Sequence, residues 1–136
     1  MADFFVDTNI FIRFLTNDDP AKARRSERLF KKAVAGEVSL ETSLLVIAEI
    51  VWTLESFYKL AKPDIADKIG KILNTPNLKV QSVSTVLQAL DVYVTKNVDF
   101  IDAYHGIMLR ETGVKRVLTY DKKHFGRMDW LSISEP

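Results

Sequence analysis

Residues 2–15, which read Ala-Asp-Phe-Phe-Val-Asp-Thr-Asn-Ile-Phe-Ile-Arg-Phe-Leu, decide how the rest of the chain is interpreted. Residues 2–6 form an apolar and aromatic run that is typical of a buried strand, and this run ends at Asp7. From Thr8 to Leu15, apolar side chains recur at the spacing of a helix. The stretch therefore predicts a strand that carries Asp7 at its carboxyl end and a helix that follows at once.

The same alternation of strand and helix continues through the remaining sequence. Further helices are predicted over about residues 20–35, 44–54, 63–73, 85–96 and 101–111, and short strands over residues 38–41, 78–83, 116–120 and 130–133. Helix starts are marked by Asp19 with Pro20 and by Ser43, and a helix end is marked by Gly113. Since no Asn-Gly or Asp-Gly turn joins two strands, we expect parallel pairing through crossovers and hence an α/β fold.

Length and composition limit the class of protein. A chain of 136 residues with 47% hydrophobic and 27% charged residues buries its own core, so we expect a single domain over residues 1–136. The net charge of +1 means that a nucleic-acid partner has to be held by a local basic patch. Because the chain has no Cys and only 2 His, any metal is expected on oxygen ligands.

The sequence contains no recognisable export signal. Asp3, Asp7 and Arg13 interrupt the first apolar residues, which does not fit a basic region followed by a clean apolar core. Charge-free stretches are also far shorter than the roughly 18 apolar residues that span a bilayer. We expect a cytoplasmic protein without membrane contact.

The predicted helix over residues 44–54 is apolar almost all round, which indicates a mostly buried helix with Trp52 in the core. Glu49 interrupts it, and a carboxylate buried there without a partner costs several kcal/mol. Thr42, Thr53 and Ser56 share its helix face, so this narrow polar stripe suits the wall of a cleft. A Glu at the solvent edge of an amphipathic helix explains the spacing equally well.

Other acids follow predicted strands or begin predicted helices. Asp7 and Asp121 fall beyond the carboxyl ends of strands, where open parallel sheets bind their ligands. Asp99 and Asp102 are three residues apart and share a face at the start of a helix. Each acid also has a purely structural interpretation, as a helix cap worth about 1 kcal/mol or as a turn residue.

Taken together, four blocks of sequence resemble the PIN-domain ribonucleases, most closely the VapC-type toxins. The blocks are residues 4–9, the pair Ala48-Glu49, residues 99–103 and residues 118–125. The resemblance covers essentially the whole chain and implies a three-layer α/β/α domain with a central, mostly parallel sheet. It also implies a metal-dependent endoribonuclease that is the toxin of a VapBC-type pair, with RNA as substrate, a cognate antitoxin as partner and a homodimeric state.

The resemblance carries roles onto individual residues. It implies that the catalytic, metal-binding acids are Asp7, Glu49, Asp102 and Asp121. Asp99 would be an accessory carboxylate, with Thr119 and Asn9 as polar support.

Basic residues near these acids are candidates for holding an RNA backbone. They are Arg13, Lys122, Lys123 and Arg127. The basic helix that starts near Pro20 suits a phosphate backbone too, or simply a solvated surface. His105 and His124 have no recognisable partner in the sequence, so we expect them to serve in packing or hydrogen bonding.

Charge explains why four gathered acids favour a cation. Two carboxylates about 6 Å apart repel by about 3 kcal/mol at an effective dielectric constant of about 20, so four of them lose on the order of 15 kcal/mol, comparable to the stability of a domain. Such a cluster takes up protons, recruits Lys or Arg, or binds divalent cations, and oxygen ligands suit Mg²⁺ or Mn²⁺ better than zinc.

Two other functions are compatible with parts of the pattern. In a non-catalytic PIN-like scaffold that binds RNA or protein, the acids would serve as caps and surface charges. An aspartate-phosphorylated domain such as a haloacid-dehalogenase-type phosphatase needs a second Asp two residues after Asp7, and the chain has Asn9 there.

Overall fold

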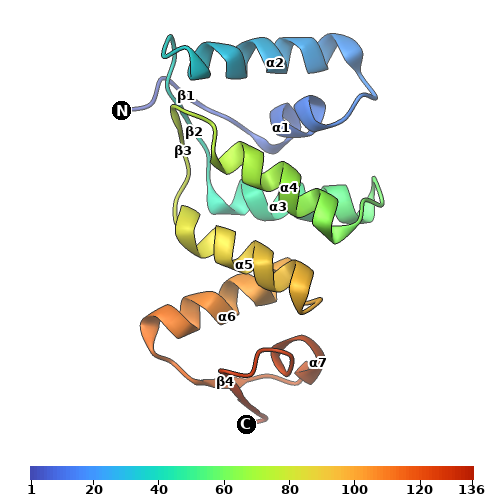
Figure 1. The fold of residues 1–136 in the computed structure, drawn as a ribbon, viewed down its shortest axis with the longest axis vertical. Coiled ribbons are helices and arrows are strands. Elements are labelled where there is room, and N and C mark those ends of the chain that lie inside the picture. The colour runs from blue at the N-terminus through green and yellow to red at the C-terminus, as the bar shows by residue number, and fades with distance from the viewer. The chain divides into compact units, whose positions relative to one another are not determined.

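Strands and helices alternate along the computed structural model, which describes residues 1–136 (Figure 1). Every strand pairing is parallel, which confirms the α/β fold class. The strands lie in two sheets, one of three strands and one of two, where the sequence led us to expect one central sheet. The chain divides into two units, Met1–Gln81 and Ser82–Pro136, and we describe each by itself. One domain over residues 1–136 stays a prediction.

The first unit contains three strands and four helices. Its elements are β1 (Phe4–Phe5), α1 (Thr8–Leu15), α2 (Pro20–Val34), β2 (Leu40–Glu41), α3 (Leu44–Ser56), α4 (Lys62–Leu73) and β3 (Leu78–Lys79). The strands pair in the order β1-β2-β3, with Phe4 opposite Leu40 and Leu40 opposite Leu78. The strand β1 lies at one edge of this sheet, and its residues Phe4 and Phe5 are 55% and 60% exposed, so the prediction of a buried strand was wrong for these two residues.

Local signals in the sequence set the helix ends. The Asp19 side chain accepts the backbone N–H of Lys22 at 3.1 Å, and Pro20 begins α2. The Ser43 hydroxyl accepts the N–H of Val46 at 3.2 Å at the start of α3. Gly36, two residues beyond the end of α2, adopts a positive φ of 78° that residues with a side chain rarely adopt.

One face of α3 contributes to the core of the first unit. Ile47, Ile50 and Leu54 on this face are fully buried, and α3 packs against α1 and α4. Leu45 and Trp52, seven residues apart, share the opposite face, and Trp52 is 69% exposed. The prediction that Trp52 belongs to the core was therefore wrong, because the apolar residues of α3 occupy two faces and only one of them packs.

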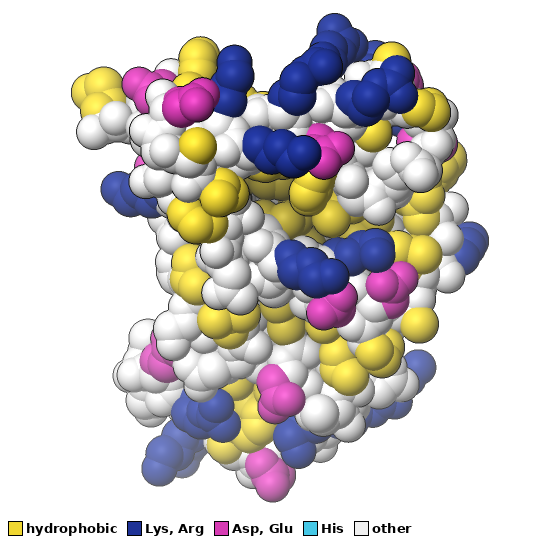
Figure 2. All heavy atoms as spheres, turned by 45° about the horizontal axis from the view of Figure 1, so that its top comes forward, with side chains coloured by type: hydrophobic (Ala, Val, Ile, Leu, Met, Phe, Trp, Pro, Cys, Tyr) yellow, Lys and Arg dark blue, Asp and Glu magenta, His cyan; other side chains and the backbone are white.

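The helix α2 is strongly basic. It carries Lys22, Arg24, Arg25, Arg28, Lys31 and Lys32, and its single acid, Glu27, pairs with Lys31 at 3.1 Å. Figure 2 shows Lys and Arg side chains gathered near the top of the view, where Figure 1 places α2.

The second unit contains α5 (Val83–Thr95), α6 (Phe100–Thr112), β4 (Arg116–Leu118), α7 (Lys122–Phe125) and β5 (Ser132–Ser134). The helices α5 and α6 pack together and bury Tyr93, Ala103 and Ile107 completely. Gly113 ends α6 with a positive φ of 83°. The short α7 has no counterpart in the sequence-based prediction, because four residues are too few to show helical periodicity. None of the helices in either unit combines the length and apolar character needed to cross a membrane.

Candidate metal centre

Asp7 and Glu49 meet in one pocket of the first unit. Asp7 directly precedes α1, and its Oδ1 accepts the backbone N–H of Thr8 at 2.8 Å, so it is a helix cap as the structural interpretation predicted. Glu49 lies in the middle of α3, exposed to solvent. The packing of α1 against α3 brings both acids to a pocket of about 250 Å³, which Asn9 and Arg13 also line.

The polar stripe predicted on α3 is only partly turned to this pocket. Thr53, one turn after Glu49, lines the pocket and donates its hydroxyl hydrogen to the Glu49 carbonyl at 2.8 Å. Ser56 instead donates to the carbonyl of Trp52 at 2.6 Å. Glu49 therefore faces solvent and the pocket together, which reconciles the two interpretations of its spacing.

Thr8 leaves an unsatisfied polar atom beside Asp7. The residue is 8% exposed, lines the same pocket, and its hydroxyl has no hydrogen-bond partner within the protein. A buried hydroxyl without a partner costs about 1–3 kcal/mol, and such groups are normally satisfied by water or a ligand. The pocket is therefore chemically suited to hold a polar occupant.

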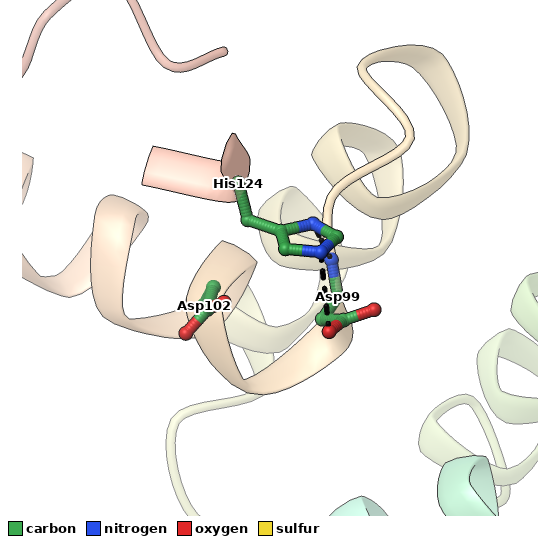
Figure 3. A group of neighbouring side chains, drawn as sticks. All are labelled: Asp99, Asp102 and His124. Carbon is green, nitrogen blue, oxygen red and sulfur yellow. Dashed lines mark hydrogen bonds and ion pairs between the residues drawn. The ribbon is translucent and has the colours of Figure 1, made fainter. Parts of the chain in front are cut away.

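Asp99, Asp102 and His124 form a second group of potential metal ligands, in the second unit (Figure 3). One ligand atom from each side chain lies within 4.8 Å of the other two. Asp99 precedes α6, Asp102 lies in its first turn, and His124 comes from α7. The helix start thus supplies two carboxylates on one side, as their spacing predicted.

His124 makes a hydrogen bond, which confirms the expectation that it serves in packing or hydrogen bonding. Its Nδ1 accepts the backbone N–H of Asp99 at 3.1 Å, and its Nε2 lies 3.4 Å from the carboxylate of Asp99. Because the two residues are 25 positions apart, only the contact of α7 with α6 reveals the pair. Sequence reasoning had one usable signal, the position of His124 three residues after Asp121.

The electrostatic environment raises the pKa of Asp102. Burial is the largest cause, and the negative charges of Asp121 and Asp99 act in the same direction, while His124 and His105 oppose the shift. Asp102 is therefore harder to ionise than a carboxyl in water, and a nearby cation would relieve this.

Asp121 and Thr119 form a local arrangement of their own. Asp121 caps α7, where its Oδ1 accepts the N–H of Lys123 at 3.2 Å. The hydroxyl of Thr119 accepts the N–H of Asp121 at 3.0 Å. Thr119 thus contacts the acid that it was expected to support, and the capping bond of Asp121 uses only one of its two carboxylate oxygens.

The four basic residues predicted to hold RNA differ in their partners. Arg13 donates to Asp18 at 3.1 Å, Lys122 pairs with Glu135 at 2.9 Å, and Arg127 donates to the carbonyl of Asn97. Lys123 is exposed and its side chain has no protein partner. Arg13 lines the pocket that Asp7 and Glu49 share.

Comparison with known proteins identifies relatives over nearly the full length. The PIN domain family matches residues 4–131, a range that contains all five acids discussed above and parts of both units. A VapC ribonuclease from Aquifex aeolicus (strain VF5) is 25% identical over 129 residues, which is 95% of this chain and 94% of that protein. Among solved structures, the crystal structure of Mycobacterium tuberculosis VapC20, described as a sarcin-ricin loop cleaving toxin, matches with a TM-score of 0.42 and 18% identity over 91% of this chain and 94% of that one.

Proposed function

We propose that this chain, which belongs to the PIN domain family, is a metal-dependent endoribonuclease that hydrolyses RNA phosphodiester bonds. The observation that carries the proposal is the family match over residues 4–131, since this range includes every candidate acid. The relative named VapC ribonuclease supports the same activity, because the two chains align over nearly all of both.

The donor atoms suit a hard divalent cation. We propose that Asp7 and Glu49 of the first unit, and Asp102 and Asp121 of the second, are ligands of Mg²⁺ or Mn²⁺, with Asp99 as an accessory carboxylate. Carboxylate oxygens are the ligands that these ions prefer. Two observations support an occupant: the buried hydroxyl of Thr8 has no partner, and like charges help to raise the pKa of Asp102.

Each side chain has a task that fits its surroundings. A bound divalent cation lowers the pKa of a water and neutralises charge on the phosphoryl oxygens. Glu49 and Asp121 are exposed carboxylates, and either one orients the attacking water or accepts its proton. His124 positions Asp99 through the contacts to its backbone and carboxylate. Arg13, Lys122, Lys123 and Arg127 attract the phosphate backbone.

The choice of RNA over DNA has a separate basis. Hydrolysis by an activated water does not use the 2′-hydroxyl, so the acids do not distinguish the two polymers. We assign RNA because the aligned relative is named a ribonuclease.

The same relative suggests a cellular role. We propose that the chain is the toxin of a VapBC-type pair, that a cognate antitoxin binds it, and that it acts as a homodimer in the cytoplasm. Expression with and without the neighbouring antitoxin gene tests the toxin role. Unaffected growth on overexpression of active enzyme would contradict it.

Cleavage of structured RNAs by the purified protein tests the activity itself. We expect cleavage with Mg²⁺ or Mn²⁺, none with a chelator, and a strong loss in Asp7→Asn. Equal cleavage by the wild type and the variant would remove Asp7 from the mechanism.

A non-catalytic PIN-like scaffold is the alternative, and one observation favours it. Asp7 and Asp121 both accept backbone N–H groups as helix caps, so these acids stabilise the starts of α1 and α7 even without a metal. Calorimetry with millimolar Mn²⁺ at neutral pH separates the two functions. Absence of any binding would favour the scaffold.

A further inference from the structure

A second cavity of the first unit lies beside the pocket of Asp7 and Glu49. It has a volume of about 430 Å³ and is lined by residues of α1 and α2. Three cationic side chains, Arg13, Lys22 and Arg25, line it together with the polar Asn9 and Ser26, and no acid does. The cavity is therefore a site of concentrated positive charge on a chain whose net charge is only +1.

The cations of this cavity are poorly neutralised by the protein. Arg25 makes no hydrogen bond or ion pair, and Lys22 approaches the carboxylate of Asp19 only to 3.9 Å. Arg13 does have a partner, since it donates to Asp18 at 3.1 Å. An anion that enters the cavity thus meets at least one guanidinium whose hydrogen-bond donors are unused.

The contact with Asp18 holds Arg13 in place at the border of the cavity. The Asp18 carboxylate also accepts the hydroxyl of Tyr58 at 2.6 Å and that of Thr16 at 3.0 Å. Tyr58 and Thr16 therefore fix the position of the Asp18 carboxylate. This carboxylate in turn restricts the guanidinium of Arg13 before any ligand binds. A side chain ordered in advance loses less entropy on binding.

Arg13 and Asn9 line both this cavity and the pocket of Asp7 and Glu49. A single RNA strand whose reacting phosphate lies at the acids therefore has a neighbouring phosphate within reach of the second cavity. We propose that the cavity lined by Arg13, Lys22 and Arg25 binds a backbone phosphate of the RNA next to the one that is cleaved. This inference rests on the proposed ribonuclease function.

The chemistry favours a phosphate of a nucleic acid over the carboxylate of a protein partner. A guanidinium binds phosphate and carboxylate alike through two parallel hydrogen bonds, but a site that combines Arg and Lys without acids is typical of contacts to a nucleic-acid backbone. The cavity also shares Asn9 and Arg13 with the pocket of Asp7 and Glu49. An RNA strand bound at that pocket therefore passes the cavity. An acidic peptide is the competing occupant, and the experiment below includes it.

Arg25→Gln tests the cavity, and Arg24→Gln is its matched control. Arg24 is the preceding residue on α2, also exposed and of equal charge, but it does not line the cavity. The probe is a fluorescent single-stranded RNA, titrated with the full chain in excess chelator so that no cleavage occurs. We expect Arg25→Gln to weaken binding about tenfold, and the slope of log affinity against log salt to fall by about 0.7, the value of one phosphate contact on a single strand. Arg24→Gln should change affinity less than about twofold.

A set of RNAs with one neutral methylphosphonate each locates the contact. At one position next to the scissile bond, neutralising the phosphate should weaken binding by the wild type and by Arg24→Gln but not by Arg25→Gln. Equal losses in both arginine variants, or a loss in neither, would overturn the inference. Displacement of the RNA by a polyglutamate peptide that depends on Arg25 but not on Arg24 would assign the cavity to a protein partner and also overturn it.

Cleavage assays with metal distinguish this inference from the function on which it rests. If the wild type cleaves RNA and Arg25→Gln binds RNA as tightly as the wild type, the phosphate site is wrong and the ribonuclease stands. If the wild type neither binds nor cleaves RNA, both fail. Thermal unfolding of each variant, followed by circular dichroism, checks that the fold is kept.

Discussion

The imidazole of His124 contacts Asp99 twice, through the backbone and through the carboxylate. Nδ1 accepts the Asp99 N–H at 3.1 Å, so in the neutral ring the proton resides on Nε2, which lies 3.4 Å from Oδ2 of the same residue. This contact orients one carboxylate of the candidate metal centre and joins α7 to the start of α6. His124 is thus a positioning residue.

Replacing His124 with Ala should weaken the binding of divalent cations. Partners that orient a metal ligand typically contribute a factor of about 10 to 100 in affinity, and we expect a loss near the lower value for Mn²⁺ in calorimetry. His105→Ala is the comparison, since His105 is exposed on α6 and has no hydrogen bond to Asp99, although its charge also acts on Asp102. Similar affinities for both variants would contradict the positioning role.

Asp7 offers a way to separate capping from metal binding. Asn caps a helix as well as Asp, so Asp7→Asn should keep the free energy of unfolding of the metal-free protein, whereas Asp7→Ala should lose about 1 kcal/mol. Both variants should lose at least about 100-fold in cleavage rate, because both remove a proposed metal ligand. Denaturant unfolding and RNA cleavage measure the two effects.

Asp64→Asn is the matched control, as Asp64 lies in the first turn of α4 and pairs with Lys68 outside the candidate centre. It should leave cleavage unchanged. A variant Asp7→Asn that remains as active as the wild type would exclude Asp7 as a ligand.

Asp102 should make the metal-free protein less stable at neutral pH than at mildly acidic pH. Burial above all, together with the charges of Asp121 and Asp99, raises its pKa in the folded state above the usual value of 3.8. The folded protein therefore takes up a proton before the unfolded chain does, and the destabilisation by the ionised carboxylate disappears as the pH falls through this raised pKa. Asp102→Asn should accordingly raise the melting temperature in chelator at pH 7.

The diagnostic measurement is the difference in melting temperature between Asp102→Asn and the wild type, followed as a function of pH. Its size should shrink as the pH falls through the raised pKa and vanish only well below 3.8, where the carboxyl is protonated in both the folded and the unfolded state. Asp91→Asn, at an exposed position of α5, should show no such pattern. A difference in melting temperature that grows towards acidic pH would mean that folding lowers the pKa of Asp102 and does not raise it.

The cap of α3 should stabilise the helix that carries Glu49. Ser43→Ala removes the acceptor for the Val46 N–H and should lower the free energy of unfolding by about 1 kcal/mol. Ser56→Ala is the control at the other end of the helix, where the hydroxyl only bonds back to the Trp52 carbonyl, and should change stability by less than about 0.5 kcal/mol. Urea unfolding compares the two, and an equal effect would contradict the capping role.

Local features of the sequence were enough to predict the α/β class, the parallel pairing and most helix starts. The side chains of Asp19 and Ser43 each accept one backbone N–H from three residues further on, so their effect does not depend on distant parts of the chain. The carboxylates Asp99 and Asp102 share a face for the same reason, because helix geometry alone relates residues three apart.

Contacts between distant residues were decided by the tertiary structure alone. Packing of α1 on α3 brings Asp7 to Glu49, and packing of α7 on α6 brings His124 to Asp99, although neither pair is close in sequence. Packing also determined which apolar face of α3 is buried, and it left Trp52 exposed. The packing of α1 against α2 made Arg25, but not Arg24, part of the lining of their shared cavity. Periodicity along one helix describes its faces, but only the neighbouring elements determine what each face meets.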